Sequence, residues 1–246
     1  MKVFRILIAL IVLSTGFYSC TNKENRTRDN AIDSTLQVNT TSILEEKLSE
    51  INAQSGQVVV MEVQSGHIKA LVGLTKKDST DYQSCENFSV WQSTGLMHPI
   101  SLLTALETGK VKLSDKVDTG NGIYQVHGRE LKDHNWHRGG YGELTVQEGL
   151  TVSSNIAIYK TMEKAFGDNP HTFFDLLANM SYGKPDSING IASLQPYKII
   201  EKNIPWNCIG YEQLISPIQV LTFYNAIANN GKMIQPQLYK DSVVVT

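Results

Sequence analysis

The chain has 246 residues, with 22 Lys and Arg against 24 Asp and Glu, which gives a formal charge of −2. Hydrophobic residues make up 41% and charged residues 19%, an ordinary globular composition that excludes collagen-like, low-complexity and wholly disordered chains. Because no net positive charge is present to attract phosphates, we expect no nucleic-acid partner. The length fits one large domain or two small ones.

The first residues resemble a secretory signal. Lys2 and Arg5 form a basic start before an uncharged, mostly apolar run at residues 6–18, which is shorter than the about 20 residues that a membrane-spanning helix needs. Cys20 follows a small serine, an arrangement that resembles a bacterial lipoprotein signal covering residues 1–19, in which the cysteine carries the lipid. An uncleaved anchor and ordinary secretion remain alternatives. All three predict a body outside the cytoplasm, and the first predicts lipid attachment to the cell envelope through Cys20.

Residues 20–41 are polar and are expected to form a flexible tether. Ser42 and Glu45 have the spacing of a helix capping box, and the apolar residues after them recur at helical spacing, which predicts a helix over 42–53. Two β-rich runs at 58–63 and 67–72 flank a short turn sequence. They predict a β-hairpin.

The rest of the chain is expected to be mainly helical. Capping boxes at Thr145 and Ser216, Pro near helix starts and Gly near helix ends mark the boundaries. The predicted helices are a short one after Thr145 and longer ones at 99–107, 155–166, 172–180 and 218–228, with loops at 110–143 and 181–215. A hairpin followed by helices predicts an α+β domain rather than a βαβ series.

Two groups of residues raise the question of metal or disulfide sites. Cys85 and Cys208 could pair in an oxidising compartment, or form two separate half-buried thiols, because no spacing relates them. His134 and His137 follow Asp133 with His-x-x-His spacing, but zinc needs three or four ligands. We therefore expect a polar surface loop at this place, with no metal and no cofactor.

Four segments occur in a characteristic order: GQVVVMEVQSGHIKALVG, GELTVQEGLTVSSN, IGYEQLISPIQVLTFYNAIANNG and IQPQL. Together they resemble the transpeptidase domain of penicillin-binding proteins, specifically the monofunctional class B type, over about residues 42–240. The resemblance implies the penicillin-binding-protein/β-lactamase-like α+β fold, a helical region with a partial antiparallel sheet. It also implies peptidoglycan stem peptides or β-lactams as ligands and a cell-wall synthesis protein as a candidate partner.

The chemistry of that family uses the motifs Ser-x-x-Lys, Ser-x-Asn and Lys-Thr-Gly. The first serine attacks the D-Ala-D-Ala amide or a β-lactam, and a lysine one helical turn on takes its proton. The second motif is present as Ser153-Ser154-Asn155, and the resemblance carries its proton-shuttling and substrate-holding roles to Ser153 and Asn155. A helix N-cap made by Ser153 or Ser154 is the structural alternative.

The first motif is degenerate. In the stretch from Thr94 to Pro99, Gly95 stands at the position of the nucleophilic serine and His98 at that of the lysine. Glycine has no side chain and cannot form an acyl-enzyme, while His98 is suited to act as a base near neutral pH but would have nothing to activate. Thr94, four residues from His98, is an alternative nucleophile.

The third motif is absent from the sequence, since no Lys-Thr-Gly or Lys-Ser-Gly occurs. The only literal Ser-x-x-Lys, at residues 181–184, lies in an expected loop and is interpreted as a coincidence. We expect a domain over 42–246 that is shortened at its C-terminal end and catalytically inactive, and that recognises stem peptides. An active D,D-transpeptidase with a non-standard nucleophile or a partner chain, a scaffold lipoprotein and the remnant of an interrupted reading frame remain alternatives.

Overall fold

The computed structural model describes residues 29–78, 81–85, 88, 94–191 and 194–240. The chain divides into two compact units, each built from segments that are distant in sequence. Unit 1 comprises Met1–Val90, Gly183–Pro196 and Ser216–Thr246, and unit 2 comprises Trp91–Tyr182 and Tyr197–Ile215. The predicted signal at 1–19 and its lipid site, Cys20, lie outside the described residues.

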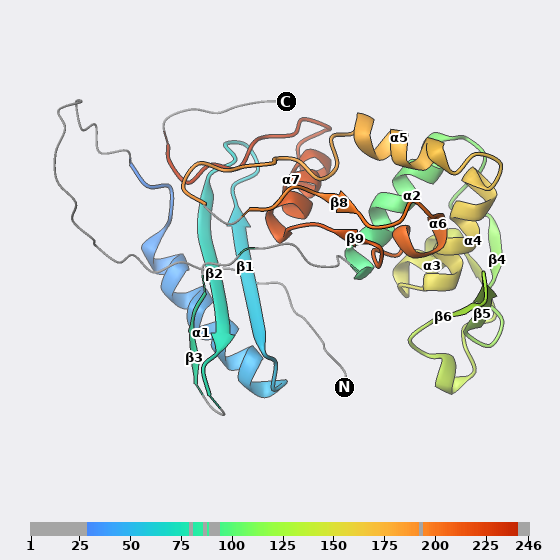
Figure 1. The fold of residues 1–246 in the computed structure, drawn as a ribbon, viewed down its shortest axis with the longest axis horizontal. Coiled ribbons are helices and arrows are strands. Elements are labelled where there is room, and N and C mark those ends of the chain that lie inside the picture. The colour runs from blue at the N-terminus through green and yellow to red at the C-terminus, as the bar shows by residue number, and fades with distance from the viewer. Residues whose placement is uncertain (1–28, 79–80, 86–87, 89–93, 192–193, 241–246) are drawn as a thin grey trace. The chain divides into compact units, whose positions relative to one another are not determined.

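Unit 1 contains a three-stranded antiparallel sheet in the order β1-β2-β3 (Figure 1). Its strands are β1 (Ser55–Met61), β2 (Ile68–Lys76) and β3 (Tyr82–Ser84). The predicted hairpin is therefore confirmed, whereas β3 was not predicted. Gly66 in the hairpin turn has φ +72°, and a Cβ there would lie 2.3 Å from the backbone oxygen of Gln235. Only glycine fits this turn, because it tolerates a left-handed backbone and has no Cβ.

Helix α1 (Ser34–Glu50) packs against this sheet. The prediction of a helix start at Ser42 is wrong, as is the extension of the flexible tether to residue 41. The helix begins at an Asp33 N-cap, whose side chain accepts a hydrogen bond from the Leu36 backbone N–H. Gln37 exchanges two side-chain hydrogen bonds with the backbone of Leu71 in β2. These contacts between distant segments stabilise a polar turn of helix that composition alone assigns to a tether.

The core of unit 1 lies between α1, the sheet and α7 (Pro217–Ala228). The predicted capping box of Ser216 and Gln219 at the start of α7 is confirmed. After α7 the chain returns beside the hairpin, where the Ile68 N–H donates to the Gln237 oxygen at 2.8 Å. The fully buried members of this core are Leu44, Leu48, Ile68, Ala70, Leu71 and Ile218.

Most of the helices that the sequence predicts after the hairpin lie in unit 2. Helix α2 (Met97–Glu107) follows the 3₁₀ turn Thr94–Leu96 and packs against α4 (Asn155–Phe166). The capping box of Thr145 and Glu148 opens α3 (Val146–Thr151) as expected. The remaining helices are α5 (His171–Asn179) and α6 (Ile204–Asn207).

The stretches of unit 2 expected to be loops contain short antiparallel strand pairs. In these pairs β4 (Lys116–Asp118) joins β7 (Glu143–Thr145), β5 (Ile123–Val126) joins β6 (Arg129–Lys132), and β8 (Lys198–Ile199) joins β9 (Gln213–Leu214). Such short strands carry too few residues for a period-2 pattern to mark them. The whole is the α+β architecture predicted from the sequence.

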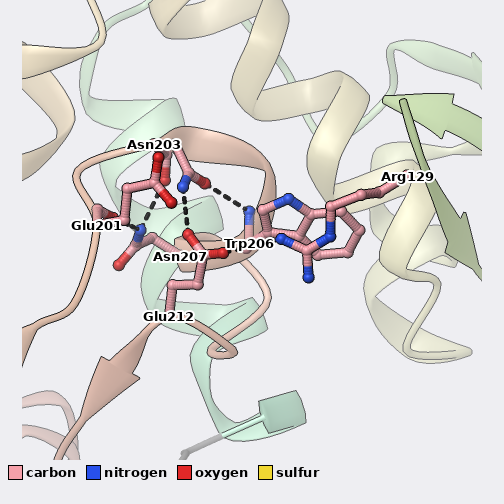
Figure 2. A network of polar contacts seen from close by, with 6 residues as sticks. All are labelled: Arg129, Glu201, Asn203, Trp206, Asn207 and Glu212. Carbon is pink, nitrogen blue, oxygen red and sulfur yellow. Dashed lines mark hydrogen bonds and ion pairs between the residues drawn. The ribbon is translucent and has the colours of Figure 1, made fainter. Parts of the chain in front are cut away.

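A polar network fixes the short helix α6 (Figure 2). The Arg129 guanidinium lies 4.0 Å from the Trp206 ring centroid and pairs with Glu212 at 3.0 Å. The Asn203 side chain donates to Glu212 and accepts from the Trp206 N–H, which makes Asn203 the N-cap of α6. The next residue after α6, Cys208, accepts a hydrogen bond from Ser101 of α2 at 2.8 Å. The network thus stabilises the segment against which α2 is anchored.

The two described cysteines are both free thiols, Cys85 half-buried and Cys208 buried. Burial raises the pKa of the Cys208 thiol, so this group is inert at neutral pH. Among the helices of the described ranges, none has the length and apolar character that a membrane crossing requires.

Candidate active site at the start of helix α4

The second motif forms the turn between α3 and α4, and its two serines have different roles. Ser154 is the N-cap of α4: its Oγ accepts a hydrogen bond from the Ala157 N–H at 3.0 Å, and its side chain is buried. Ser153 is exposed and has φ +55°, a left-handed backbone conformation that is uncommon outside glycine. The capping alternative therefore applies to Ser154 alone, which leaves the Ser153 hydroxyl available.

Asp133 holds this turn in place. One carboxylate oxygen accepts from Ser154 Oγ at 2.8 Å, and the other accepts from the Ile156 N–H at 3.0 Å. The Asp133 side chain is 1% exposed. Burial raises its pKa, while the hydrogen bonds from Ile156 and Ser154 act in the opposite direction. The expectation of a polar surface loop from Asp133 onward is wrong at this residue, which is a buried structural anchor.

The histidines of the same segment are placed differently. His134 Nε2 lies 3.0 Å from the Tyr141 hydroxyl, and His137 belongs to a short 3₁₀ turn, Trp136–Arg138. In the part of the chain that the structure describes, no group of three His, Cys, Asp or Glu side chains is arranged to hold a metal ion.

A chain of hydrogen bonds joins both motifs. Ser153 Oγ lies 3.0 Å from Nδ1 of His98 in α2, and Nε2 of His98 lies 3.1 Å from Oδ1 of Asn155. His98 is 2% exposed. The sequence predicted that these three residues share a site, and the structure brings them together. The expectation that His98 has nothing to activate is wrong, because the Ser153 hydroxyl is its direct neighbour.

The direction of each bond follows from the amide of Asn155. Its Nδ2 donates to the backbone oxygen of Lys132 at 2.8 Å, so its Oδ1 faces His98. An amide oxygen only accepts, which requires a proton on Nε2 of His98. In a neutral imidazole the other nitrogen, Nδ1, then carries a lone pair and accepts from Ser153 Oγ–H. We assign this tautomer to His98 from the hydrogen-bond network.

The environment of His98 keeps it neutral. Burial lowers its pKa from 6.5 to about 4, and the hydrogen bond to Asn155 opposes that shift. The unprotonated Nδ1 is thus present throughout the neutral range. A neutral histidine whose Nδ1 faces a serine hydroxyl can accept the hydroxyl proton, and a pKa this far below neutral makes it a weak base.

Gly95 lies next to this group, in the 3₁₀ turn before α2. A Cβ at Gly95 would lie 3.5 Å from Ser153 Oγ, which is ordinary van der Waals contact. Gly95 is thus close to the second motif, and its assignment to the position of the first-motif serine stays a prediction. The backbone of Thr94 belongs to the same turn, but its side chain lies outside what the structure describes, so its role as an alternative nucleophile stays a prediction.

The literal Ser-x-x-Lys at 181–184 does not lie on a helix. Ser181 and Gly183 both have positive φ, +56° and +89°, in the turn that follows α5. A helical face shared by Ser181 and Lys184 is therefore absent from this segment, in agreement with its interpretation as a coincidence.

The family model named "Penicillin binding protein transpeptidase domain" matches residues 56–244. The chain belongs to this family. Among curated members, the chain is 24% identical over 214 residues to the peptidoglycan D,D-transpeptidase FtsI of Escherichia coli (strain K12), a match that covers 82% of the chain and 35% of that protein. It is 23% identical over 227 residues to a probable peptidoglycan D,D-transpeptidase, PbpC, of Pseudomonas aeruginosa, covering 86% of the chain and 39% of that protein. The chain thus spans little more than a third of these relatives.

Solved structures of the family share the fold. A peptidoglycan glycosyltransferase structure from Burkholderia ambifaria superposes with a TM-score of 0.70 at 23% identity, covering 88% of the chain and 68% of that structure. The transpeptidase domain of penicillin-binding protein 3 from Burkholderia pseudomallei gives a TM-score of 0.68 at 22% identity, covering 90% of the chain and 64% of that structure. Both confirm the penicillin-binding-protein type of fold predicted from the ordered segments.

Sequence reasoning missed two parts of the site. The first is Asp133, which lies between strand β6 and the polar segment that contains His134 and His137. No local sequence signal indicates that it is buried. The second is the bond between Ser153 and His98. A signal for it existed, because the family brings its first and second motifs together, so a histidine at the lysine position should face the second-motif serine.

Proposed function

We propose that this chain is a cell-envelope domain of the penicillin-binding-protein family that recognises peptidoglycan stem peptides and lacks the serine–lysine acylation of that family. One observation carries the proposal: residue 95, which lies beside Ser153, is a glycine, and His98 occupies the lysine position. No acyl-enzyme can form on a residue without a side chain. The D,D-transpeptidase cycle that starts from a first-motif serine is therefore unavailable to this domain.

Recognition of the ligand does not need that serine. Ser153 presents an exposed hydroxyl, and the second-motif pair of Ser153 and Asn155 is intact. The curated relatives are named peptidoglycan D,D-transpeptidases, which supports a stem peptide or a β-lactam that mimics it as the ligand. A cell-wall synthesis protein is the candidate protein partner.

Sedimentation with purified peptidoglycan sacculi tests this recognition. We expect the full chain to sediment with sacculi and to be released by a soluble acyl-D-Ala-D-Ala peptide, but not by its acyl-D-Ala-L-Ala isomer. The Ser114→Ala variant, which changes an exposed serine of unit 2, serves as the matched control and should bind like the original chain. A chain that stays in the supernatant would overturn the proposal in favour of a scaffold without peptidoglycan contact.

Attachment to the envelope is the second part of the proposal. It rests on the basic start, the short apolar run and the position of Cys20. We expect the chain to fractionate with membranes and the Cys20→Ser variant to be released in soluble form, because it has no thiol to carry lipid. The Cys85→Ser variant, which removes a half-buried thiol of unit 1, should fractionate like the original. Equal fractionation of both variants would contradict lipidation at Cys20.

A further inference from the structure

We propose that Ser153 is itself a nucleophile, with His98 as its general base and Asn155 as the residue that positions the base, so that this domain reacts with esters and activated amides as acyl donors. The proposal goes beyond stem-peptide recognition and does not depend on it. It assigns the reaction to the second-motif serine in place of the first-motif serine that the family uses.

The geometry meets each requirement of an activated serine. Nucleophile and base lie within hydrogen-bonding distance, since Ser153 Oγ is 3.0 Å from His98 Nδ1. The base and the positioning group also lie within hydrogen-bonding distance, since His98 Nε2 is 3.1 Å from Asn155 Oδ1. The amide of Asn155 is itself fixed by the backbone oxygen of Lys132 at 2.8 Å. A nucleophile, a base and a group that holds the base in the correct tautomer are the parts of a serine-hydrolase triad.

The backbone presents Ser153 outward. Its φ of +55° is a left-handed conformation that is uncommon in non-glycine residues and is concentrated at functional sites. The neighbouring Ser154 and Asp133 hold the start of α4, and so keep this turn in place. Gly95, which has no side chain, lies close to this hydroxyl, since a Cβ at residue 95 would be 3.5 Å from Ser153 Oγ.

The proposed step is balanced without an oxidant, reductant or metal. Ser153 Oγ bonds to the acyl carbon, its proton moves to Nδ1 of His98, and the bond from the acyl carbon to the leaving group breaks. The leaving alcohol or amine takes the proton from Nδ1. Water then repeats the step on the acyl-serine, which releases the acid and restores the Ser153 hydroxyl.

A serine-directed fluorophosphonate probe tests the proposal on the full chain, because it needs no knowledge of the natural acyl donor. Attack by Ser153 Oγ forms a P–O bond and expels fluoride, which leaves a stable adduct that mass spectrometry can map. We expect one adduct, on Ser153. The Ser153→Ala variant should lose it and the Ser114→Ala variant should keep it. An adduct on another serine or on Thr94, or no adduct at all, would overturn the assignment.

Two further variants separate activation from mere packing. Loss of the base in His98→Gln should slow labelling about 100-fold, the usual scale of general-base catalysis. Asn155→Leu has about the size of asparagine but no oxygen to accept from His98 Nε2, so it should label at least about tenfold more slowly than the original chain. Labelling of Asn155→Leu at the rate of the original chain would contradict the positioning role of Asn155.

A thiol version of the same test remains valid if the His98 variant does not fold. In the Ser153→Cys variant we expect iodoacetamide to alkylate the new thiol at least about tenfold faster than the exposed thiol of Ser114→Cys, because His98 accepts the thiol proton. Equal rates would overturn activation by His98. Neither probe is a peptidoglycan analogue, so the two proposals can fail separately. Labelling without sacculus binding would contradict the proposed function alone. Sacculus binding without labelling would contradict this inference alone.

Discussion

Ser153 Oγ and His98 Nδ1 lie 3.0 Å apart, although 55 positions separate the two residues in the chain. This bond joins the intact second motif to the degenerate first one. The histidine at the lysine position is therefore not an isolated replacement, since it faces the only motif serine that the chain retains. In the proposed alignment Gly95 and His98 stand at the first-motif Ser and Lys positions, and Ser153 is then the serine that has a base beside it.

The left-handed backbone at Ser153 predicts an unusual order of stability among variants. Ser153→Gly should be about 1 kcal/mol more stable than Ser153→Ala, because φ +55° strains a residue with a Cβ and does not strain glycine. Urea unfolding of the two variants measures the difference. At Thr151, within helix α3, the order should reverse, because glycine weakens a helix relative to alanine. The same order at both positions would contradict strain at Ser153.

His98 should make the domain less stable in mild acid. Its folded-state pKa, about 4, lies below its unfolded value of 6.5, so the unfolded chain binds a proton first as the pH falls. The stabilisation is complete above about pH 6.5 and is lost progressively toward pH 4, with a total of roughly 3 kcal/mol. Urea unfolding between pH 7 and 4.5 measures this loss. In His98→Gln the free energy of unfolding should fall less steeply with falling pH, because the contribution of His98 is gone. An unchanged pH dependence would contradict a neutral buried His98.

Removal of the Asp133 carboxylate should loosen the start of α4. In Asp133→Ala, the Ser154 hydroxyl and the Ile156 N–H lose their acceptor, and a buried donor without a partner is costly. We expect a loss of about 3 kcal/mol in the free energy of unfolding, measured by urea titration. Asp175→Ala, at an exposed position of α5, should change stability by less than about 0.5 kcal/mol. Similar losses in both variants would show that Asp133 is not an anchor.

Serine and lysine placed at residues 95 and 98 should allow acylation by penicillin, because the alignment assigns these residues to the first motif. A Cβ at residue 95 has room, so the double variant Gly95→Ser with His98→Lys should fold and form a penicillin adduct at position 95, detected by peptide mass mapping. Gly95→Ser alone retains His98 and should react more slowly, because the base already bonds Ser153. A penicillin adduct of the folded double variant at a residue other than 95 would contradict the placement of the first motif.

The parts of the fold that the sequence predicted depend on local signals. The capping boxes at Thr145 and Ser216 and the two β-rich runs of the hairpin are each local in sequence, and the structure has all three. The start of α1 was missed because it depends on Gln37 bonding to a strand 34 positions away. Strand β3 was missed because three residues carry no usable period.

The site divides in the same way. The residue types at Ser153, Asn155, Gly95 and His98 could be read from motif order. The burial of Asp133, the left-handed turn and the tautomer of His98 could not, because each depends on contacts made by the folded chain. The hydrogen bond from Asn155 to the Lys132 backbone oxygen is the clearest example. No sequence motif marks a main-chain acceptor, yet this acceptor decides which nitrogen of His98 carries the proton.

The protonation state of His98 tests the account most directly. Long-range ¹H–¹⁵N NMR of the full chain resolves both imidazole nitrogens, and the signals that disappear in His98→Gln identify this residue among the six histidines. At about pH 6 the account predicts a proton on Nε2 and none on Nδ1, since the pKa of His98 is about 4. A proton on Nδ1, alone or together with one on Nε2, would contradict the role of His98 as the base for Ser153.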